Sequence, residues 1–369
     1  MKVLVCPDKF KGTLTAAEAA RAMAAGWKQA RPSDHVEQLP ISDGGDGFGE
    51  LISQLLGAAP QTSKVIDAAH RPCEASWWLH SATQTAVVES ARVIGLAQLP
   101  RGKYHPFELD TEGLGLLLKE IAQSGAKRCL IGVGGSATND GGFGMARALG
   151  WQFFNTHAEK IDRWPELHAL AEVRPPEKSG LFNELIVAVD VQNPLLGEQG
   201  CTRIYGPQKG LRPTDFEFAE RCLERLSDLL VKELHRDSAS EPGAGAAGGL
   251  GFGLSSFAGG KLAPGFALFA QHAKLPERIS GADLVVTGEG ALDGSTLMGK
   301  GVGELASICQ EKHVRCIGIA GIVPQPEQAA RLFTQTHALA PDFTSTENAL
   351  ARPAEFLQSL TAKVASRLS

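Results

Sequence analysis

At 369 residues, with 43% hydrophobic and 21% charged residues, the chain has the composition of a folded protein of about two or three domains. A formal net charge of −5, without any lysine and arginine run longer than two residues, argues against nucleic acid as a partner. The seven cysteines include no CxxC pair and the ten histidines no HxxxH spacing, so we expect reduced thiols in the cytoplasm and no zinc site. The N-terminal apolar run is too short for a signal peptide, and the glycine-rich segment 243–254 is too short to span a bilayer, so no membrane partner is expected.

The start of the chain alternates between strand and helix patterns. Residues 3–6 form an apolar run typical of a buried strand, and Thr15 opens a capping box for a helix that ends at Pro32. A second strand is predicted at 36–41 and a second helix at 48–56. A strand–helix–strand–helix order implies a parallel sheet.

The middle of the chain is less regular, and the alternation returns near its end. Strands are predicted at 86–89, 128–133, 185–189, 283–287 and 314–319. Helices are predicted from the N-cap Thr111 to Gly125, and at 142–149, 218–234, 301–312, 326–335 and 346–367.

These patterns predict an α/β protein made of two α/β domains. One would be a Rossmann- or flavodoxin-like parallel sheet built from both termini, residues 1–65 and 281–369. The other would be a mixed α/β domain, residues 66–280, inserted into the first.

Glycines and a carboxylate follow an apolar run at three places, residues 42–47, 134–142 and 287–294. Ligands of open α/β sheets bind beyond the carboxyl ends of the strands, where such segments would lie. Glycine allows backbone N–H groups to approach an anion, and carboxylates bind Mg²⁺ or accept a proton. The combination indicates phosphoryl transfer to a small molecule.

In the first cluster, Asp43 follows the strand directly and is a candidate metal ligand or proton acceptor, with Gly44 and Gly45 beside it. Asp46 is equally suited to cap the next helix. Near the N-terminus, Lys9 and Lys11 are candidates to hold a carboxylate or phosphate, and solvated loop lysines are the alternative.

In the second cluster, Gly134, Gly135, Ser136 and Asn139 are candidates for a tight anion-binding loop. Two alternatives stay open. Residues 132–137 match the G-x-G-x-x-A dinucleotide pattern, although an acidic residue about twenty positions later is only loosely supplied. A simple strand-to-helix turn is the other alternative.

Asp190 follows the apolar run 185–189 and is a candidate base toward a hydroxyl group, or a turn residue before a proline. Glu289 and Asp293 are a candidate magnesium pair, or part of a solvated loop. Residues 294–300 have P-loop spacing but lack the hydroxyl residue and do not follow a strand directly, although Lys300 could still bind phosphate near a helix N-terminus.

Seven segments, taken together and in order, resemble the bacterial glycerate kinase family, which differs from P-loop kinases and from the sugar-kinase folds. They are 7–16 (PDKFKGTLTA), 40–47 (PISDGGDG), 132–142 (GVGGSATNDGG), 190–195 (DVQNPL), 205–210 (YGPQKG), 245–251 (GAAGGLG) and 287–293 (TGEGALD).

The resemblance implies ATP- and Mg²⁺-dependent phosphorylation of D-glycerate, at the 2-hydroxyl, in a cleft between two α/β domains. It adds Asn193 to the expected substrate or phosphate contacts. The chain departs from many members at Ser42, Arg92, Ala291 and Ser295. Arg92 could alter substrate choice, and Ala291 removes an arginine that could contact phosphate.

On this reading Asp190 is the base, and Asp43 supports Mg²⁺ or is the alternative base. Glu289 and Asp293 position the metal. ATP and D-glycerate are the expected partners of a cytoplasmic monomer or homodimer. The alternatives are an NAD-dependent hydroxy-acid oxidoreductase and a non-catalytic metabolite-binding protein.

Overall fold

The computed structural model describes residues 1–45, 47–177, 180–297 and 301–368. They form two compact units. The terminal unit comprises residues 1–43 and 269–369, and the inserted unit comprises residues 44–268. In the described part of the chain, no helix combines the length and apolar character that crossing a membrane would require.

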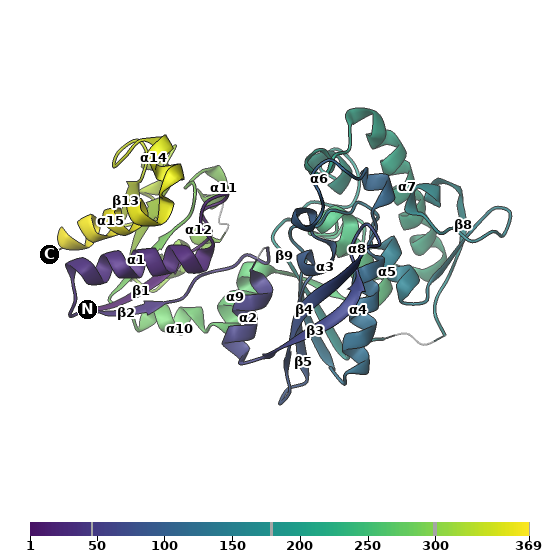
Figure 1. Ribbon diagram of the computed structural model, residues 1–369, viewed down its shortest axis with the longest axis horizontal. Coiled ribbons are helices and arrows are strands. Elements are labelled where there is room, and N and C mark those ends of the chain that lie inside the picture. The colour runs from purple at the N-terminus through teal and green to yellow at the C-terminus, as the bar shows by residue number, and fades with distance from the viewer. Residues whose placement is uncertain (46, 178–179, 298–300, 369) are drawn as a thin grey trace. The chain divides into compact units, whose positions relative to one another are not determined.

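The terminal unit contains five parallel strands in the order β13-β12-β11-β1-β2 (Figure 1). The strands are β1 (Lys2–Pro7), β2 (His35–Gln38), β11 (Leu284–Gly288), β12 (Arg315–Ala320) and β13 (Gln335–Ala338). The helices are α1 (Ala16–Ala30), α10 (Leu275–Ser280), α11 (Gly294–Leu297), α12 (Val302–Glu311), α13 (Pro326–Ala329), α14 (Thr346–Ala351) and α15 (Pro353–Ser366), with α9 (Gly265–His272) crossing the boundary between units.

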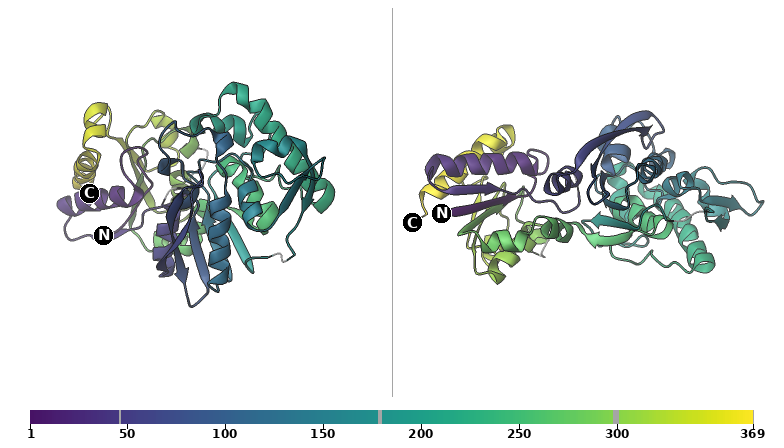
Figure 2. Two further views of the ribbon diagram at one scale, coloured as in Figure 1. Left: turned by 45° about the vertical axis from the view of Figure 1, so that its right-hand side comes forward. Right: turned by 90° about the horizontal axis from the view of Figure 1, so that it is seen from below.

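Helices cover both faces of this sheet, as the purple, yellow and green helices of Figure 2 show. On one face, Met23 and Trp27 of α1 and Leu360 of α15 pack on alternate residues of β1, β11 and β12. On the other face, Leu305 and Cys309 of α12 are fully buried. The predicted capping box at Thr15 is present and begins α1.

The inserted unit contains a six-stranded mixed sheet in the order β10-β9-β6-β5-β4-β3, and a separate antiparallel pair, β7 and β8. The strands are β3 (Ala59–Ile66), β4 (Pro72–His80), β5 (Thr85–Glu89), β6 (Arg128–Gly132), β7 (Gln152–Asn155), β8 (Leu170–Arg174), β9 (Glu184–Val189) and β10 (Lys261–Pro264). Strands β5, β6, β9 and β10 are parallel, whereas β3, β4 and β5 are joined in antiparallel pairs.

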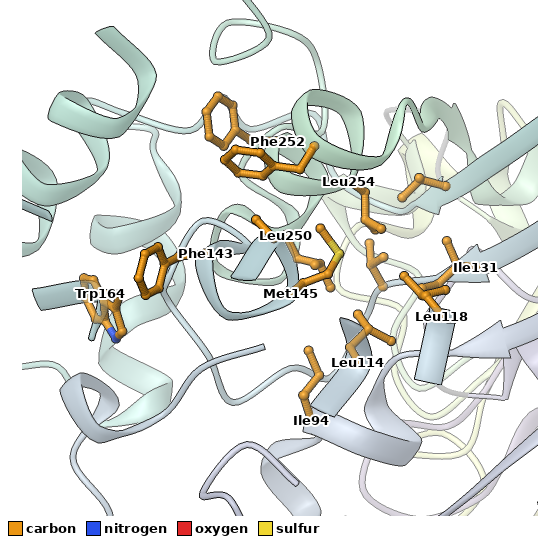
Figure 3. Packing of buried hydrophobic residues seen from close by; sticks show 14 of the residues in the cluster. Ile94, Leu114, Leu118, Ile131, Phe143, Met145, Trp164, Leu250, Phe252 and Leu254 are labelled. Carbon is orange, nitrogen blue, oxygen red and sulfur yellow. The ribbon is translucent and has the colours of Figure 1, made fainter. Parts of the chain in front are cut away.

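The helices of the inserted unit are α2 (Phe48–Leu56), α3 (Ala91–Ile94), α4 (Glu112–Gln123), α5 (Phe143–Ala148), α6 (Cys201–Lys209), α7 (Pro213–Leu234) and α8 (Ala246–Ala258), with short 3₁₀ turns at Leu96–Gln98, Pro106–Glu108 and Trp164–Ala169. Side chains from α3, α4, β6, α5 and α8 meet in one apolar core (Figure 3). Ile94, Leu118 and Ile131 have no exposed surface, so this core fixes the ends of the parallel strands.

The boundaries of the two units differ from those predicted from the sequence, which were residues 1–65 plus 281–369 for one domain and residues 66–280 for the other. Residues 48–65, which hold helix α2 and most of strand β3, were placed in the first domain, but they belong to the inserted unit. The reason is pairing: β3 is hydrogen-bonded to β4 along its whole length. The βαβα pattern of the sequence does not reveal that sheet partner.

Three details of the secondary structure differ from the sequence-based expectation. Residues 326–335 form only the short α13, and the polar strand β13 follows. The expected helix 346–367 is broken at Arg352, because Pro353 lacks an N–H and starts a new helix. Thr111 stands at the N-cap of α4, but its side chain makes no capping hydrogen bond.

Candidate active site

Four acidic residues of the terminal unit follow the carboxyl ends of neighbouring strands. Asp8 follows β1, Asp43 lies beyond β2, and Glu289 and Asp293 follow β11. Strand β1 lies between β11 and β2 in a parallel sheet, so all three strand ends point to the same edge. The sheet therefore brings together residues that are almost 300 positions apart in the sequence.

The carboxyl group of Glu289 has a raised pKa. Burial is the main cause that raises the pKa of its carboxyl group to about 7. The negative charges of Asp8, Asp293 and Asp43 act in the same direction. A hydrogen bond of 2.7 Å from the hydroxyl of Thr296 to Glu289 Oε1 opposes the rise. The four carboxylates are thus close enough to interact through their charges.

The loop after β1 carries two lysines, and one of them lies close to a carboxylate of this group. Lys9 Nζ lies 3.9 Å from Asp43 Oδ1. The side chain of Lys11 is exposed, and the backbone nitrogen of Lys11 lies close to Gly290. Asp46 and Lys300, two candidates from the sequence, lie outside the described residues.

The carboxylates fit a magnesium ion by the chemistry of their donor atoms. Mg²⁺ prefers oxygen ligands and is usually held by one or two carboxylates together with phosphate oxygens. A divalent cation would also relieve the charge that disfavours ionised Glu289. Asp8 was not selected from the sequence as a site residue. The signal that could have found it is its place directly after the first strand.

The second group of candidates lies in the inserted unit, in the loop between β6 and α5. Gly134 lies near the start of this loop, and Gly135 has a φ of 74°, a left-handed conformation that favours glycine. Ser136 and Asn139 follow and are buried. The Ser136 hydroxyl accepts a hydrogen bond from Thr138 N at 3.1 Å, so this side chain shapes the loop itself.

A glycine-rich turn at the start of α8 packs against this loop. Ser136 Oγ donates to Ala247 O at 3.2 Å. Ala247, Gly248 and Gly249 all have positive φ. A Cβ atom on Gly248 would lie 1.9 Å from Thr138 O, so no other residue fits at this position. The turn therefore packs against the candidate anion-binding loop and supports its conformation.

Two polar side chains of α6 hold the same loop. Lys209 is buried and donates to Thr138 O at 2.6 Å. Its burial lowers the pKa of the ammonium group to about 8. Asn139 Nδ2 donates to Thr202 Oγ1 at 3.0 Å, whereas Asn139 Oδ1 has no hydrogen-bond partner within the described residues. Asn139 is thus anchored on one side only.

Asp190 follows β9, whose carboxyl end neighbours that of β6 in the sheet. Tyr205 of α6 lies near it: burial, and then the charge of Asp190, raises the pKa of Tyr205 to about 12. Tyr205 Oη donates to Asn193 Oδ1 at 2.6 Å, and Asn193 Nδ2 donates to Gln199 O at 2.8 Å. Both ends of the Asn193 amide therefore have partners in the surrounding chain.

The segment of the first glycine cluster that follows Asp43 belongs to the inserted unit. A Cβ atom on Gly44 would lie 3.3 Å from the carbonyl carbon of Ala188, which places this turn at the end of β9. Gly45 follows, and Gly47 N donates to Glu89 Oε1 at 2.8 Å. Arg92, one of the departures noted above, donates to Glu89 Oε2 at 3.2 Å.

The whole chain matches a family of known proteins. The model of the Glycerate kinase family matches residues 3–369. A protein named glycerate kinase, from Halalkalibacterium halodurans, is 36% identical over 330 residues, covering 89% of this chain and 87% of its own length. A protein named glycerate 2-kinase, from Escherichia coli K12, is 35% identical over 327 residues, covering 87% and 85%. The crystal structure of a putative glycerate kinase 2 from Salmonella typhimurium LT2 superposes with a TM-score of 0.82 at 30% identity, covering 99% of this chain and 97% of that one.

This chain belongs to the glycerate kinase family. The resemblance seen in the sequence and the α/β fold class are thereby confirmed. Membership of the glycerate kinase family also decides between the alternatives, because it favours an ATP-dependent kinase over a nicotinamide-dependent oxidoreductase.

Within this glycerate kinase fold, the candidates form two sets, one in each unit. Asp43, Lys9, Glu289 and Asp293 are joined by Asp8 in the terminal unit. The set of the inserted unit contains Gly44, Gly45, Gly134, Gly135, Ser136, Asn139, Asp190 and Asn193. Tyr205 and Lys209 were not selected individually from the sequence, although the segment 205–210 pointed to them.

Proposed function

We propose that this chain transfers the γ-phosphoryl group of ATP to the 2-hydroxyl of D-glycerate, giving 2-phosphoglycerate and ADP. The observation that carries the proposal is the family match, which extends over residues 3–369. The relative named glycerate 2-kinase, whose match covers 87% of this chain, supports transfer to the 2-hydroxyl.

In the inserted unit, we assign the role of base to Asp190. Its carboxylate follows the carboxyl end of β9, where such a group can accept the proton of a hydroxyl. Accepting the proton of the glycerate hydroxyl as the oxygen attacks phosphorus would prevent an unfavourable positive charge on that oxygen.

The loop after β6 is proposed to bind the phosphate or carboxylate groups of the substrates. Its backbone at Gly134 and Gly135 can donate N–H groups to an anion, because no side chain blocks the approach. Ser136 and Asn139 are buried and hydrogen-bonded inside the unit, which supports a role in shaping the loop beside any direct contact. Asn193 is proposed to contact substrate next to Asp190.

In the terminal unit, we propose that Asp8, Asp43, Glu289 and Asp293 supply the carboxylates that hold Mg²⁺. Bound Mg²⁺ would neutralise charge on the phosphates of ATP. Lys9 and Lys11 are proposed to face the same anions, since phosphoryl transfer depends chiefly on positioning and charge neutralisation. Asp43 remains the alternative base.

The proposal is tested by incubating the purified protein with MgATP and D-glycerate while ADP release is followed. Phosphorus NMR of the product distinguishes phosphate on carbon 2 from phosphate on carbon 3. Release of ADP only with D-glycerate, together with the 2-phosphorylated product, would support the proposal. A 3-phosphorylated product would overturn the proposed position of transfer, and ADP release independent of D-glycerate would overturn the substrate.

We also propose a cytoplasmic location and a monomeric or homodimeric state. All seven cysteines are free, and six of them are buried, as is usual for proteins of a reducing compartment. Size-exclusion chromatography with light scattering measures the oligomeric state, and a mass above that of a dimer would contradict the proposal.

A further inference from the structure

A cavity of about 450 Å³ lies in the terminal unit beside the edge strand of its sheet. Its walls come from β13, from the segment that follows β13, and from the second half of α15 with the residues just after it. Small-molecule sites in proteins commonly have volumes between about 300 and 1,000 Å³. We propose that this pocket binds a small organic anion, a carboxylate or a phosphate monoester with a short apolar body, through His337, Lys363 and Arg367.

The charged groups of the pocket are mainly basic. His337 lies on β13, Lys363 lies on α15, and Arg367 follows four positions later as the C-cap residue of α15. Asp342 is the acidic residue of the lining. In the part of the chain that the structure describes, neither Lys363 nor Arg367 has a carboxylate within ion-pair distance. Their charges therefore remain available to an anion.

The inner part of the pocket is apolar. Leu360 and Val364 of α15 also line the pocket and are only 4% and 3% exposed. Phe343 completes this wall, and the ammonium group of Lys363 lies 5.1 Å from the centre of its ring. An occupant with an anionic group and a body of a few carbons would match both parts of the lining.

The surroundings of His337 in the pocket lower the pKa of its imidazole. Burial lowers the pKa of His337, and the charges of Arg367 and then Lys363 lower it further. A bound anion would offset these two charges and raise the pKa of the ring, so binding would be accompanied by proton uptake near that pKa. The charged groups that line the pocket with the ring are Asp342 from the following segment, Lys363 from α15 and Arg367 at the C-cap of α15, and His337 Nε2 lies 3.4 Å from Gln335 Oε1.

The pocket is distinct from the carboxylates proposed to hold magnesium. Those carboxylates follow β1, β2 and β11, whereas β12 separates β11 from β13 in the sheet. The pocket is lined along β13 itself and contains none of them. The inference therefore does not depend on the proposed function of the chain.

The test uses the full-length protein without nucleotide, at constant ionic strength. Butyl phosphate, butyrate and inorganic phosphate are titrated separately while the ring signals of His337, assigned with H337Q, are followed by NMR. We expect a saturable shift of these signals, with butyl phosphate or butyrate binding at least about threefold more tightly than inorganic phosphate. The stronger of the two organic probes identifies the anionic group.

The variant K363M/R367M removes both charges, and K312M removes an exposed lysine of the same unit as a matched control. We expect the double variant to weaken binding about tenfold or more, and K312M to leave it unchanged. Both substituted residues are exposed, and unchanged glycerate kinase activity together with an unchanged thermal melt verifies folding.

Three results would overturn the inference. The first is that no probe saturates the His337 signals up to about 20 mM, since an affinity weaker than that would not make a useful site. The second is that K363M/R367M binds the probe with the same affinity as wild type. The third is that MgATP and D-glycerate displace the probe.

Discussion

The Nζ atom of Lys209 lies 2.6 Å from the backbone oxygen of Thr138, joining α6 to the loop after β6. Lys209 is only 6% exposed, and Gly248 also lies close to both its ammonium group and Thr138 O. A buried cation is stabilised only when polar groups compensate for its lost hydration. The contact therefore ties together the glycine-rich turn and the loop that we propose to bind anions.

Replacing Lys209 by methionine should damage the loop. Hydrogen bonds from charged groups contribute about 1.5–3 kcal/mol, so we expect K209M to lower the free energy of unfolding by about that amount. We also expect the KM for one of the anionic substrates to rise about tenfold, because the loop loses its support. Urea unfolding and steady-state kinetics measure the two effects.

K232M is the matched control for K209M, because Lys232 is an exposed lysine of the inserted unit. We expect this control to behave as wild type in both measurements. A K209M enzyme with reduced stability but wild-type KM values would contradict a role for Lys209 in positioning the loop.

Asp190 is expected to be needed for the chemical step. The substitution D190N keeps the shape of the side chain but removes its ability to accept a proton, so turnover should fall by about a hundredfold or more. The effect should appear in kcat rather than in KM, and D237N, at an exposed position, should be unaffected. A near-normal rate of ADP release in D190N would leave Asp43 as the proposed base.

Tyr205 is expected to act through Asn193 rather than on the substrate. The change Y205F removes the hydroxyl that donates to Asn193 Oδ1 at 2.6 Å and leaves the ring in place. The loss of one neutral hydrogen bond is worth about 1 kcal/mol, which corresponds to a change of about fivefold in kcat/KM. Kinetics with D-glycerate measure it, and a loss as large as that of D190N would show that the hydroxyl has a more direct role.

The parts of this molecule that are determined by local sequence were predictable. Apolar runs located β1, β2, β6, β9 and β11, and the strand-end rule then pointed to Asp43, Asp190 and Glu289. Strands β3 and β13 were not found, because they carry many polar residues and are at sheet edges, where only one side is paired.

The supporting residues of the candidate site were harder to predict for a different reason. Lys209 and Tyr205 lie on α6, which no strand directly precedes, and their partners are residues 138 and 193. The periodicity of a helix sequence shows which face is buried, but it does not show which loop that face will contact. The motif at 205–210 indicated that the segment matters but not what its side chains do.

The last prediction concerns pH and follows from the pKa of about 7 for Glu289, against an ordinary value of 4.5. Because the folded-state pKa is raised, the contribution of this group to stability is complete below about pH 4.5 and is lost as the pH rises through about 7. Without metal, the difference in unfolding free energy between wild type and E289Q should therefore change across that interval.

Mg²⁺ competes with the proton for the same carboxylate of Glu289. The affinity of the wild-type protein for Mg²⁺ should therefore increase from pH 6 to pH 8, by about tenfold at most. The variant E289Q should bind Mg²⁺ more weakly and with a flatter pH dependence, while E311Q, at an exposed position, should match wild type. Calorimetric titration with MgCl₂ at the two pH values decides the matter, since an unchanged pH dependence in E289Q would remove Glu289 from the proposed metal ligands.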